Sequence, residues 1–468
     1  MLQISHISKT FNPGTVNEKK ALNGIDLHLD AGDFVTILGS NGTGKSTLFG
    51  AIAGSFVVDE GTIRLDGQNI TSLPDYKRSK FIGRLFQDPL KGTAPSMTIE
   101  ENLALAYLRA SEKRSPFSVV TAKDRAGFRE KLAQVKTRGS TSAYAATKAS
   151  LLALQDAGLE QADEDAVVFI GNDSFSMGEF TNEILRFEQE QKMNIMVVPM
   201  TMQSSIDSWV TIALGTHGMS SVLNMACASA TTAVGWGYDN IQNGTCSMAI
   251  CGGTTYISDK NLTMNKGFEY LKCSTTDPDG MVYPFSEERN GFLFSEGGAC
   301  MLILEELEHA LRRNAKIYAE ITGFESSSDA YGIIAMQPDG TIIERMLRKL
   351  IGDKKIDYYN AHGTSTILND EIEAKVLRNI FGHKEQQPAI NSSKAFLGHN
   401  LASSGAFELA ICVDSIQHNK VHGNLGGTIL EDLNYTLETR ELPVNTAVSA
   451  SFGFGGYNSA ILLERYKG

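Results

Sequence analysis

Residues 221–230, with the sequence SVLNMACASA, decide the fold of the larger part of this chain. The apolar residues Val222–Met225 are typical of a buried strand, and the small residues that follow are typical of a closely packed helix. Cys227 is therefore expected at a helix N-terminus. There, unpaired N–H groups and the positive end of the helix dipole favour a thiolate and lower the thiol pKa.

Two histidines far downstream lie in glycine-containing loops, each after a short apolar strand. Ile356–Tyr359 leads to His362 in the sequence AHGTST, and Pro388–Ser393 leads to His399 in the sequence KAFLGH. A thiolate can accept an acyl group, and two neutral imidazoles can hold a thioester oxygen. One thiol and two imidazoles at three strand ends therefore predict covalent acyl chemistry.

These motifs, in this order, resemble the β-ketoacyl-(acyl carrier protein) synthases, the elongating condensing enzymes of the thiolase-like fold. The resemblance covers roughly residues 140–468 and rests on several motifs rather than one. They are the Cys227 segment, YPF at 283–285, RNGF at 289–292, SEGG at 295–298, the His362 and His399 loops, and FGFGG at 452–456.

The resemblance implies an α/β fold of the layered α/β/α/β/α type, with two related halves. Cys227 would be the nucleophile, and His362 and His399 would hold the malonyl thioester. Lys394 would support the electrostatics of the site, and Glu408 would be a structural partner.

The resemblance also assigns the groups around the nucleophile. The backbone N–H groups of Cys227 and Phe454 would form the oxyanion hole, and the Phe454 side chain would gate the acyl pocket. The hydroxyl groups of Thr364 and Thr366 would bind a phosphopantetheine arm.

The implied reaction condenses a Cys-bound acyl group with a malonyl-carrier thioester. CO₂ leaves, and a 3-oxoacyl-carrier product forms in fatty acid or polyketide synthesis. The implied partners are an acyl carrier protein and a second copy of the chain in a homodimer. Condensation would need no cofactor and no metal in this domain.

Residues 1–135 carry a different motif. The apolar strand Phe34–Leu38 runs into GSNGTGKST at 39–47, the glycine loop, lysine and hydroxyl pattern that binds nucleotide phosphates and Mg²⁺. With its flanking strands, this segment resembles the N-terminal part of the ATP-binding subunits of ABC transporters, a partial P-loop NTPase. The nucleotide-binding candidates, for ATP and Mg²⁺, are Gly39, Asn41, Gly42, Gly44, Lys45, Ser46, Thr47 and Gln87.

Both resemblances are incomplete. No Leu-Ser-Gly-Gly-Gln signature, Asp-Glu strand end or switch histidine follows the P-loop, and the condensing-enzyme region lacks its usual first segment. The expected domains are a truncated ATP-binding segment at 1–135 and a synthase domain at 140–468. The alternatives are a component of an ABC transporter, a catalytically silent partner of a second synthase, and a non-functional fusion of two partial genes. A glycine-rich turn without a ligand is the other interpretation of the P-loop.

Composition narrows the class of protein. The chain has 468 residues, 42% of them hydrophobic, and a formal net charge of -12, which argues against a nucleic-acid binder because phosphate contacts need a basic face. Six cysteines without metal-ligand spacing favour a reducing compartment. The absence of a transmembrane run or signal pattern predicts a soluble, cytoplasmic protein.

The P-loop generates one prediction. Lys45→Ala should abolish any ATP binding, because the lysine and the loop amides hold the phosphates. ATP turnover should stay at background in the wild-type protein and in Lys45→Ala, because the family's water-orienting and second metal-binding groups are missing. Binding of labelled ATP and phosphate release measure both quantities, and a steady ATPase rate that Lys45→Ala removes would contradict the interpretation.

Overall fold

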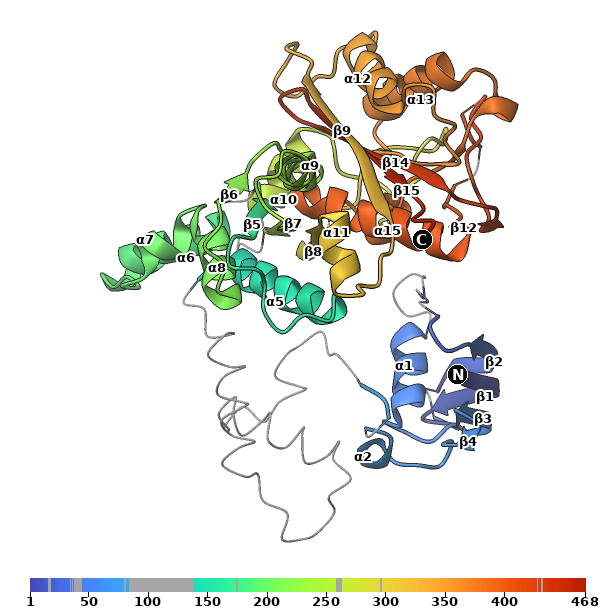
Figure 1. Cartoon of the computed structure of the whole chain (residues 1–468). Coiled ribbons are helices and arrows are strands. Elements are labelled where there is room, and N and C mark those ends of the chain that lie inside the picture. Colours follow the sequence, from blue (N-terminus) through green and yellow to red (C-terminus); the bar gives the residue numbers. More distant parts are fainter. Residues whose placement is uncertain are drawn as a thin grey trace. The chain divides into compact units, whose positions relative to one another are not determined.

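The chain is described by a computed structural model (Figure 1). The residues described are 1–15, 18–33, 35, 37, 44–79, 81–83, 139–173, 176–257, 263–294, 297–426, 428–430 and 432–468. The chain divides into two compact units, Met1–Gln134 and Val135–Gly468, and each is considered by itself.

The first unit contains an antiparallel sheet with the strand order β2-β1-β3-β4. The apolar side chains of Ile4 and Ile7 of β1 and Ile63 of β3 are buried in its core together with Leu48 of α1. The elements are β1 (Leu2–Phe11), β2 (Lys19–Leu29), α1 (Lys45–Ala53), β3 (Glu60–Leu65), β4 (Gln68–Asn69) and α2 (Asp75–Arg78).

The second unit is a mixed α/β structure. Its first half contains α5 (Thr141–Asp156), β5 (Val167–Gly171), α6 (Met177–Glu190), α7 (Val197–Thr201), α8 (Ser205–Leu214), β6 (Ser220–Leu223), α9 (Ser229–Gln242), β7 (Met248–Tyr256), α10 (Thr263–Tyr270), β8 (Gly297–Glu305) and α11 (Leu307–Arg312). Its second half contains β9 (Glu320–Ser328), α12 (Thr341–Ile351), β10 (Tyr358–Asn360), α13 (Ile367–Phe381), η2 (Lys384–Gln386), β11 (Ala389–Asn391), α14 (Lys394–Leu397), η3 (Leu401–Ser403), α15 (Ser404–His418), β12 (Lys420–Val421), β13 (Arg440–Glu441), β14 (Thr446–Gly453) and β15 (Tyr457–Glu464).

The two halves repeat one topology. The first sheet has the order β6-β5-β7-β8 and the second the order β11-β10-β14-β15-β9. In each sheet the first three strands are parallel, and the next strand, β8 or β15, is antiparallel. Within the described residues, β9 covers the outer edge of β15, but no strand pairs with the outer edge of β8. Residues 302–304 of β8 are accordingly half-buried, whereas the equivalent residues 461–463 of β15 are buried.

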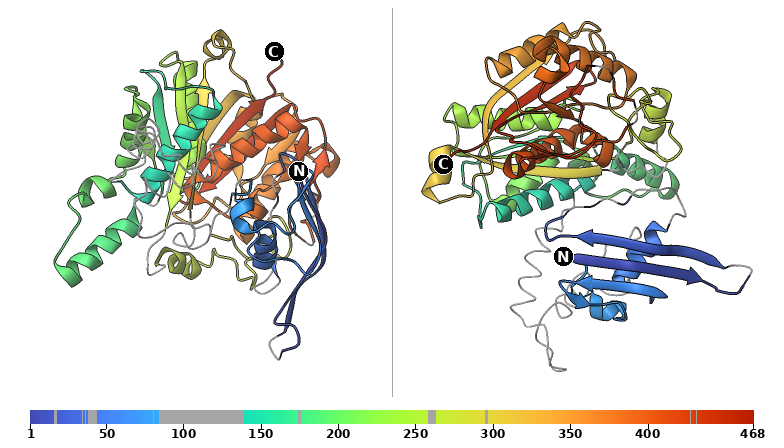
Figure 2. Two further views of the ribbon diagram at one scale, coloured as in Figure 1. Left: turned by 90° about the horizontal axis from the view of Figure 1, so that it is seen from below. Right: turned by 90° about the vertical axis from the view of Figure 1, so that its right-hand side faces the viewer.

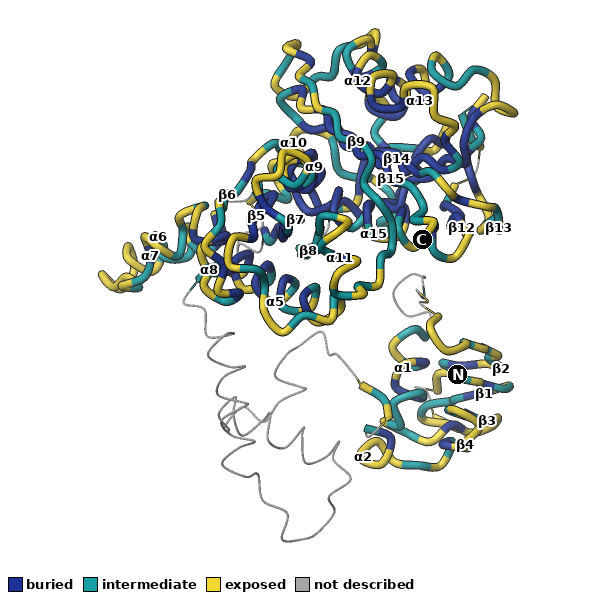
Figure 3. Tube along the Cα trace, in the orientation of Figure 1, coloured by how far each residue is buried: buried dark blue, intermediate teal, exposed yellow. Residues whose placement is uncertain are grey.

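The helices complete five layers, which can be followed in Figure 1 and Figure 2. Helices α5 and α8 pack on the outer face of the first sheet, and α12, with α13 beside it, packs on the second. Helices α9 and α15 contact each other and strands of both sheets, so they form the middle layer. The expected layered α/β/α/β/α fold is therefore confirmed, and strands β5, β7, β14 and β15 are mostly buried (Figure 3).

The expected strands differ from the observed ones mainly at their ends. Val222–Met225 was expected to be extended, but β6 ends at Leu223, because the chain turns there toward α9. The strands expected at 356–359 and 388–393 correspond to β10 and β11. The strand expected at Phe34–Leu38 includes residues outside the described part of the chain.

The parallel strands position the site. Strands β6, β10 and β11 end close to Cys227, His362 and His399, respectively. In open α/β sheets, functional groups gather beyond the carboxyl ends of parallel strands. Among the described helices, none combines the length and apolar character needed to cross a bilayer.

Candidate active site

Cys227 lies on a sharp turn between β6 and α9. Ala226, just before it, has φ +47°, a left-handed conformation that is unusual for a residue with a side chain. The Ser229 hydroxyl group holds the turn, since it accepts the Met225 N–H at 2.8 Å and donates to the Ala226 carbonyl at 2.6 Å. A Cβ atom at Gly453 would lie 2.7 Å from the Met225 carbonyl oxygen, so only glycine permits the close approach of β14.

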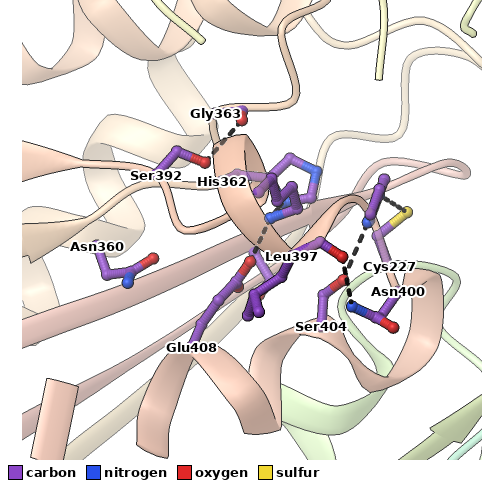
Figure 4. Close-up of polar contacts among 12 residues, drawn as sticks. Cys227, Asn360, His362, Gly363, Ser392, Leu397, Asn400, Ser404 and Glu408 are labelled. Atoms are coloured by element: carbon purple, nitrogen blue, oxygen red, sulfur yellow. Dashed lines mark hydrogen bonds and ion pairs between the residues drawn. The ribbon is translucent and has the colours of Figure 1, made fainter. Parts of the chain in front are cut away.

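Figure 4 marks a contact of the Cys227 sulfur atom with a dashed line. The partner is the Nε2 atom of His399, which lies 3.2 Å from the Cys227 Sγ atom. Its Nδ1 atom accepts the Leu401 backbone N–H at 3.2 Å and lies 3.0 Å from the Ser404 hydroxyl oxygen. A backbone N–H can only donate, so Nδ1 carries no proton in the neutral ring. The proton of the neutral imidazole is therefore on Nε2, directed toward the sulfur atom.

His362 is oriented by a buried cation. Its Nδ1 atom lies 3.4 Å from the Lys394 Nζ atom, and Lys394 forms an ion pair with Glu408. The side chains of this pair are only 3% and 2% exposed. An ammonium group has donors and no acceptor, so Nδ1 of His362 is the acceptor and its Nε2 atom carries the proton.

Both imidazoles are neutral. Burial lowers the pKa of His362 and of His399 well below the usual value, and the nearby Lys394 ammonium lowers both further. The centroids of the two imidazole rings lie 5.6 Å apart. The Cys227 Sγ atom and one ring nitrogen from each of His362 and His399 all lie within 4.8 Å of one another. Two N–H donors thus converge close to one thiol.

The expected low pKa of Cys227 is wrong. Burial raises the pKa of the thiol to about 12, and the charges of Asp173 and Glu408 raise it as well, against the opposing effect of Lys394. Removing the sulfur from water outweighs the benefit of the helix N-terminus. The resting nucleophile is therefore a thiol.

A cavity of about 570 Å³ opens at these groups. It is lined by the sequence-predicted residues Cys227, His362, His399, Thr364, Thr366 and Phe454, and by apolar side chains including Ile257, Met264, Phe268, Phe292, Ile334 and Met336. The Thr364 and Thr366 hydroxyl oxygens lie 2.8 Å apart. Lys394 lies behind His362 and not on the cavity wall. Cys273 also lines the cavity.

Two acidic residues near the site escaped sequence reasoning. Glu373 of α13 accepts the backbone N–H groups of His362 and Gly363, each at 2.9 Å, and burial raises its pKa to about 7. Asp173 lines the cavity just beyond β5. Glu373 looks like an ordinary helix residue in the sequence, and the only signal at Asp173 is its place after a buried strand.

The described residues of the predicted nucleotide site lie around the start of α1. Gly44 has φ +95°, and a Cβ atom there would lie 2.6 Å from the Ala21 carbonyl oxygen. Lys45, Ser46 and Thr47 form the first turn of α1. The other candidates, Gly39, Asn41, Gly42 and Gln87, lie outside the described residues.

Comparisons with known sequences match two families. Sequence models of the beta-ketoacyl synthase match residues 107–310 for the N-terminal domain and 318–428 for the C-terminal domain. A model of the ABC transporter family matches residues 22–185, so the two kinds of match overlap between 107 and 185.

Curated relatives include 3-oxoacyl-[acyl-carrier-protein] synthase 2 of Synechocystis sp., 36% identical over 281 residues, 58% of this chain and 67% of the relative. The synthase 2 of Staphylococcus aureus is 31% identical over 333 residues, 67% of this chain and 79% of the relative.

Solved structures of similar fold include AntDE:AntF, a type II PKS acyl-carrier protein in complex with its ketosynthase. Its TM-score is 0.64 at 27% identity, over 71% of this chain and 86% of that one. A beta-ketoacyl synthase from Burkholderia phymatum has a TM-score of 0.63 at 26% identity, over 75% and 87%.

The five-layer fold, with a cysteine from one half facing two histidines from the other, defines a thiolase-like protein. The matches to both synthase domains make the assignment more specific. The chain belongs to the β-ketoacyl synthase family.

The buried ion pair yields a stability prediction. Lys394→Ala should lower the free energy of unfolding of the second unit by about 3–5 kcal/mol, because it leaves the Glu408 carboxyl group buried without its partner. Urea unfolding followed by tryptophan fluorescence measures this, since both tryptophans of the chain, Trp209 and Trp236, belong to this unit.

The matched control is Lys349→Ala. It breaks the pair with Glu325, in which the lysine side chain is 72% exposed, and should cost less than about 1 kcal/mol. Equal losses in the two variants would contradict the importance of the buried pair.

Proposed function

We propose that the second unit catalyses the decarboxylating condensation of an acyl group on Cys227 with a malonyl-carrier thioester. The observation that carries this proposal is the convergence of the Cys227 Sγ atom and one ring nitrogen from each of His362 and His399, all within 4.8 Å of one another. Neutral N–H donors stabilise an oxygen that gains negative charge, and a thiol is the nucleophile that such a reaction requires.

In the first step the Cys227 sulfur attacks the carbonyl carbon of the acyl-carrier thioester. The backbone N–H groups of Cys227 and Phe454 stabilise the oxyanion. The bond to the carrier sulfur then breaks, and the proton lost by the Cys227 thiol ends on the carrier thiol. Because the resting thiol has a raised pKa, the proton leaves as the new bond forms and not before.

In the second step a malonyl thioester binds with its carbonyl oxygen facing His362 and His399. Their Nε2–H groups donate to this oxygen while the carbon–carbon bond to the carboxylate breaks. CO₂ leaves, and the electron pair forms an enolate whose carbon attacks the acyl-Cys227 carbonyl group. The Cys227 thiolate departs and takes one proton from solvent, and the 3-oxoacyl product is two carbons longer.

The partner in both steps is an acyl carrier protein, whose phosphopantetheine arm would pass Thr364 and Thr366 on the cavity wall. These hydroxyl groups provide donors and acceptors for the amides of such an arm. The structurally similar AntDE:AntF is a ketosynthase in complex with its acyl-carrier protein, which supports this choice of partner. Condensation requires no cofactor.

A homodimer in the cytoplasm completes the proposal. Helix α6 exposes apolar side chains on one face, at Met177, Phe180, Ile184 and Phe187. Their spacing of three, four and three residues aligns them along one stripe, which a second copy would cover.

The first unit is proposed as a separate segment, at residues 1–135, that binds ATP with Mg²⁺ and takes no part in condensation, which residues 140–468 carry out. Its support is the glycine-lysine-hydroxyl pattern at the start of α1 and the match to the ABC transporter family. Condensation would proceed at the same rate with and without ATP.

The nucleophile is tested with Cys227→Ala. The variant should form no acyl-enzyme and keep its fold, because the change removes only a sulfur atom. Intact-mass spectrometry after incubation with an acyl-carrier thioester measures the gain in mass. Cys246→Ala, a buried cysteine outside the cavity, should keep the gain. Acylation of Cys227→Ala at the wild-type level would refute the assignment.

The histidines are tested separately by decarboxylation of a malonyl-carrier thioester. His362→Ala and His399→Ala should each slow release of CO₂ on the order of a hundredfold or more, the usual loss when one oxyanion donor is removed. His418→Ala, at the exposed end of α15, serves as the control. Wild-type rates in both active-site variants would rule out their role.

A further inference from the structure

Asp173 brings a carboxyl group to the cavity wall beside Cys227. It follows β5 in the first half and is half-buried, with part of its surface facing the cavity. Its Oδ2 atom accepts the Ala402 backbone N–H at 3.1 Å, and its Oδ1 atom accepts the Thr255 hydroxyl proton at 3.2 Å. The carboxyl group therefore joins the first half of the unit to a segment of the second half.

The segment that Asp173 holds is the turn that orients His399. Leu401, directly before Ala402, donates its N–H to the His399 Nδ1 atom and has φ +45°. Two consecutive amides thus bind the imidazole and the carboxyl group. A left-handed conformation at a leucine is strained and persists only where surrounding contacts hold it.

The charge of Asp173 also acts on the nucleophile. Burial raises the pKa of Asp173 to about 7, although hydrogen bonds from Ala402 and Thr255 oppose the effect. The ionised carboxylate raises the pKa of the Cys227 thiol. Glu408 acts in the same direction and Lys394 in the opposite one, and these two groups are the same in every variant considered below.

We propose that Asp173 is a positioning residue of the condensation site, which holds the His399 turn through the Ala402 amide and restrains the reactivity of Cys227 through its negative charge. This rests on the proposed function of the same site. The two halves of the unit are then coupled directly at the reacting groups, in addition to their coupling through the middle helices.

The charge is tested by alkylation of the full chain with iodoacetamide between pH 5.5 and 9. In wild-type protein the Cys227 rate should rise less steeply above about pH 7, where Asp173 ionises. Asp173→Asn has a similar shape and no charge, so its rate should match wild type near pH 5.5 and exceed it about tenfold at pH 9, the effect of a shift of about one pKa unit.

Peptide mass spectrometry separates Cys227 from Cys273, which lines the same cavity and whose pKa is raised by burial alone. The Cys273 rate should be equal in the two proteins. Identical Cys227 profiles in wild type and Asp173→Asn would overturn the role of the charge, and so would an equal change at both cysteines, which indicates a general opening of the cavity.

The positioning role is tested by decarboxylation of a malonyl-carrier thioester. Asp173→Ala removes both hydrogen bonds and should slow the reaction about tenfold or more, because small displacements of a catalytic group are costly. Asp173→Asn keeps an acceptor for the Ala402 amide and should recover most of that loss. Equal rates in Asp173→Ala and wild type, or no recovery in Asp173→Asn, would overturn the positioning role.

The two arms also distinguish this inference from the proposed function. Alkylation needs no turnover, so a wild-type chain that alkylates as expected but neither decarboxylates nor condenses would refute the proposed function while the charge of Asp173 is still decided. A wild-type chain that condenses, with identical Cys227 alkylation profiles in wild type and Asp173→Asn, would support the proposed function and refute the role of the Asp173 charge.

Discussion

The site depends on the buried ion pair between Lys394 and Glu408. Removing two charges from water costs several kcal/mol for each ion, which their attraction offsets only where the geometry is good. The pair places an ammonium group against His362 Nδ1, which directs the proton of that imidazole to Nε2. The backbone N–H of Leu401 likewise donates to His399 Nδ1 and directs the proton of that imidazole to Nε2, without burying a charge. Both rings therefore present N–H groups to the same space.

The repeated topology explains how these groups come together. In each half of the second unit, parallel strands lead into the loops of the site, so the cysteine comes from the first half and the imidazoles from the second. The close approach of Gly453 to the Cys227 turn shows how tightly the halves are joined there. The halves differ at their outer edges, since β15 is covered by β9 while β8 has no such neighbour among the described strands.

The chain combines two kinds of segment that do not share chemistry. The synthase family matches begin at residue 107, and the ABC transporter match extends to residue 185. The site groups of the synthase all lie in the second unit, and the described residues of the P-loop pattern lie in the first. Acyl transfer to a thiol and condensation through an enolate draw no energy from a nucleotide, so nothing in the proposed reaction requires the first unit.

Local patterns in the sequence indicated the nucleophile turn and the two histidine loops, and the resemblance of these motifs to the β-ketoacyl synthases implied the fold class. The strand-to-helix change at Cys227 and the glycine loops at His362 and His399 are short-range features, so they can be recognised from neighbouring residues alone. Only the tertiary structure decided the electrostatics. His399 is 172 residues from Cys227 in the chain, and the burial that raises the thiol pKa and keeps both imidazoles neutral comes from packing between distant segments. The sequence did not predict the roles of Asp173 and Glu373 for the same reason. Each carboxyl group belongs to the site through backbone amides that it accepts from other elements of the fold.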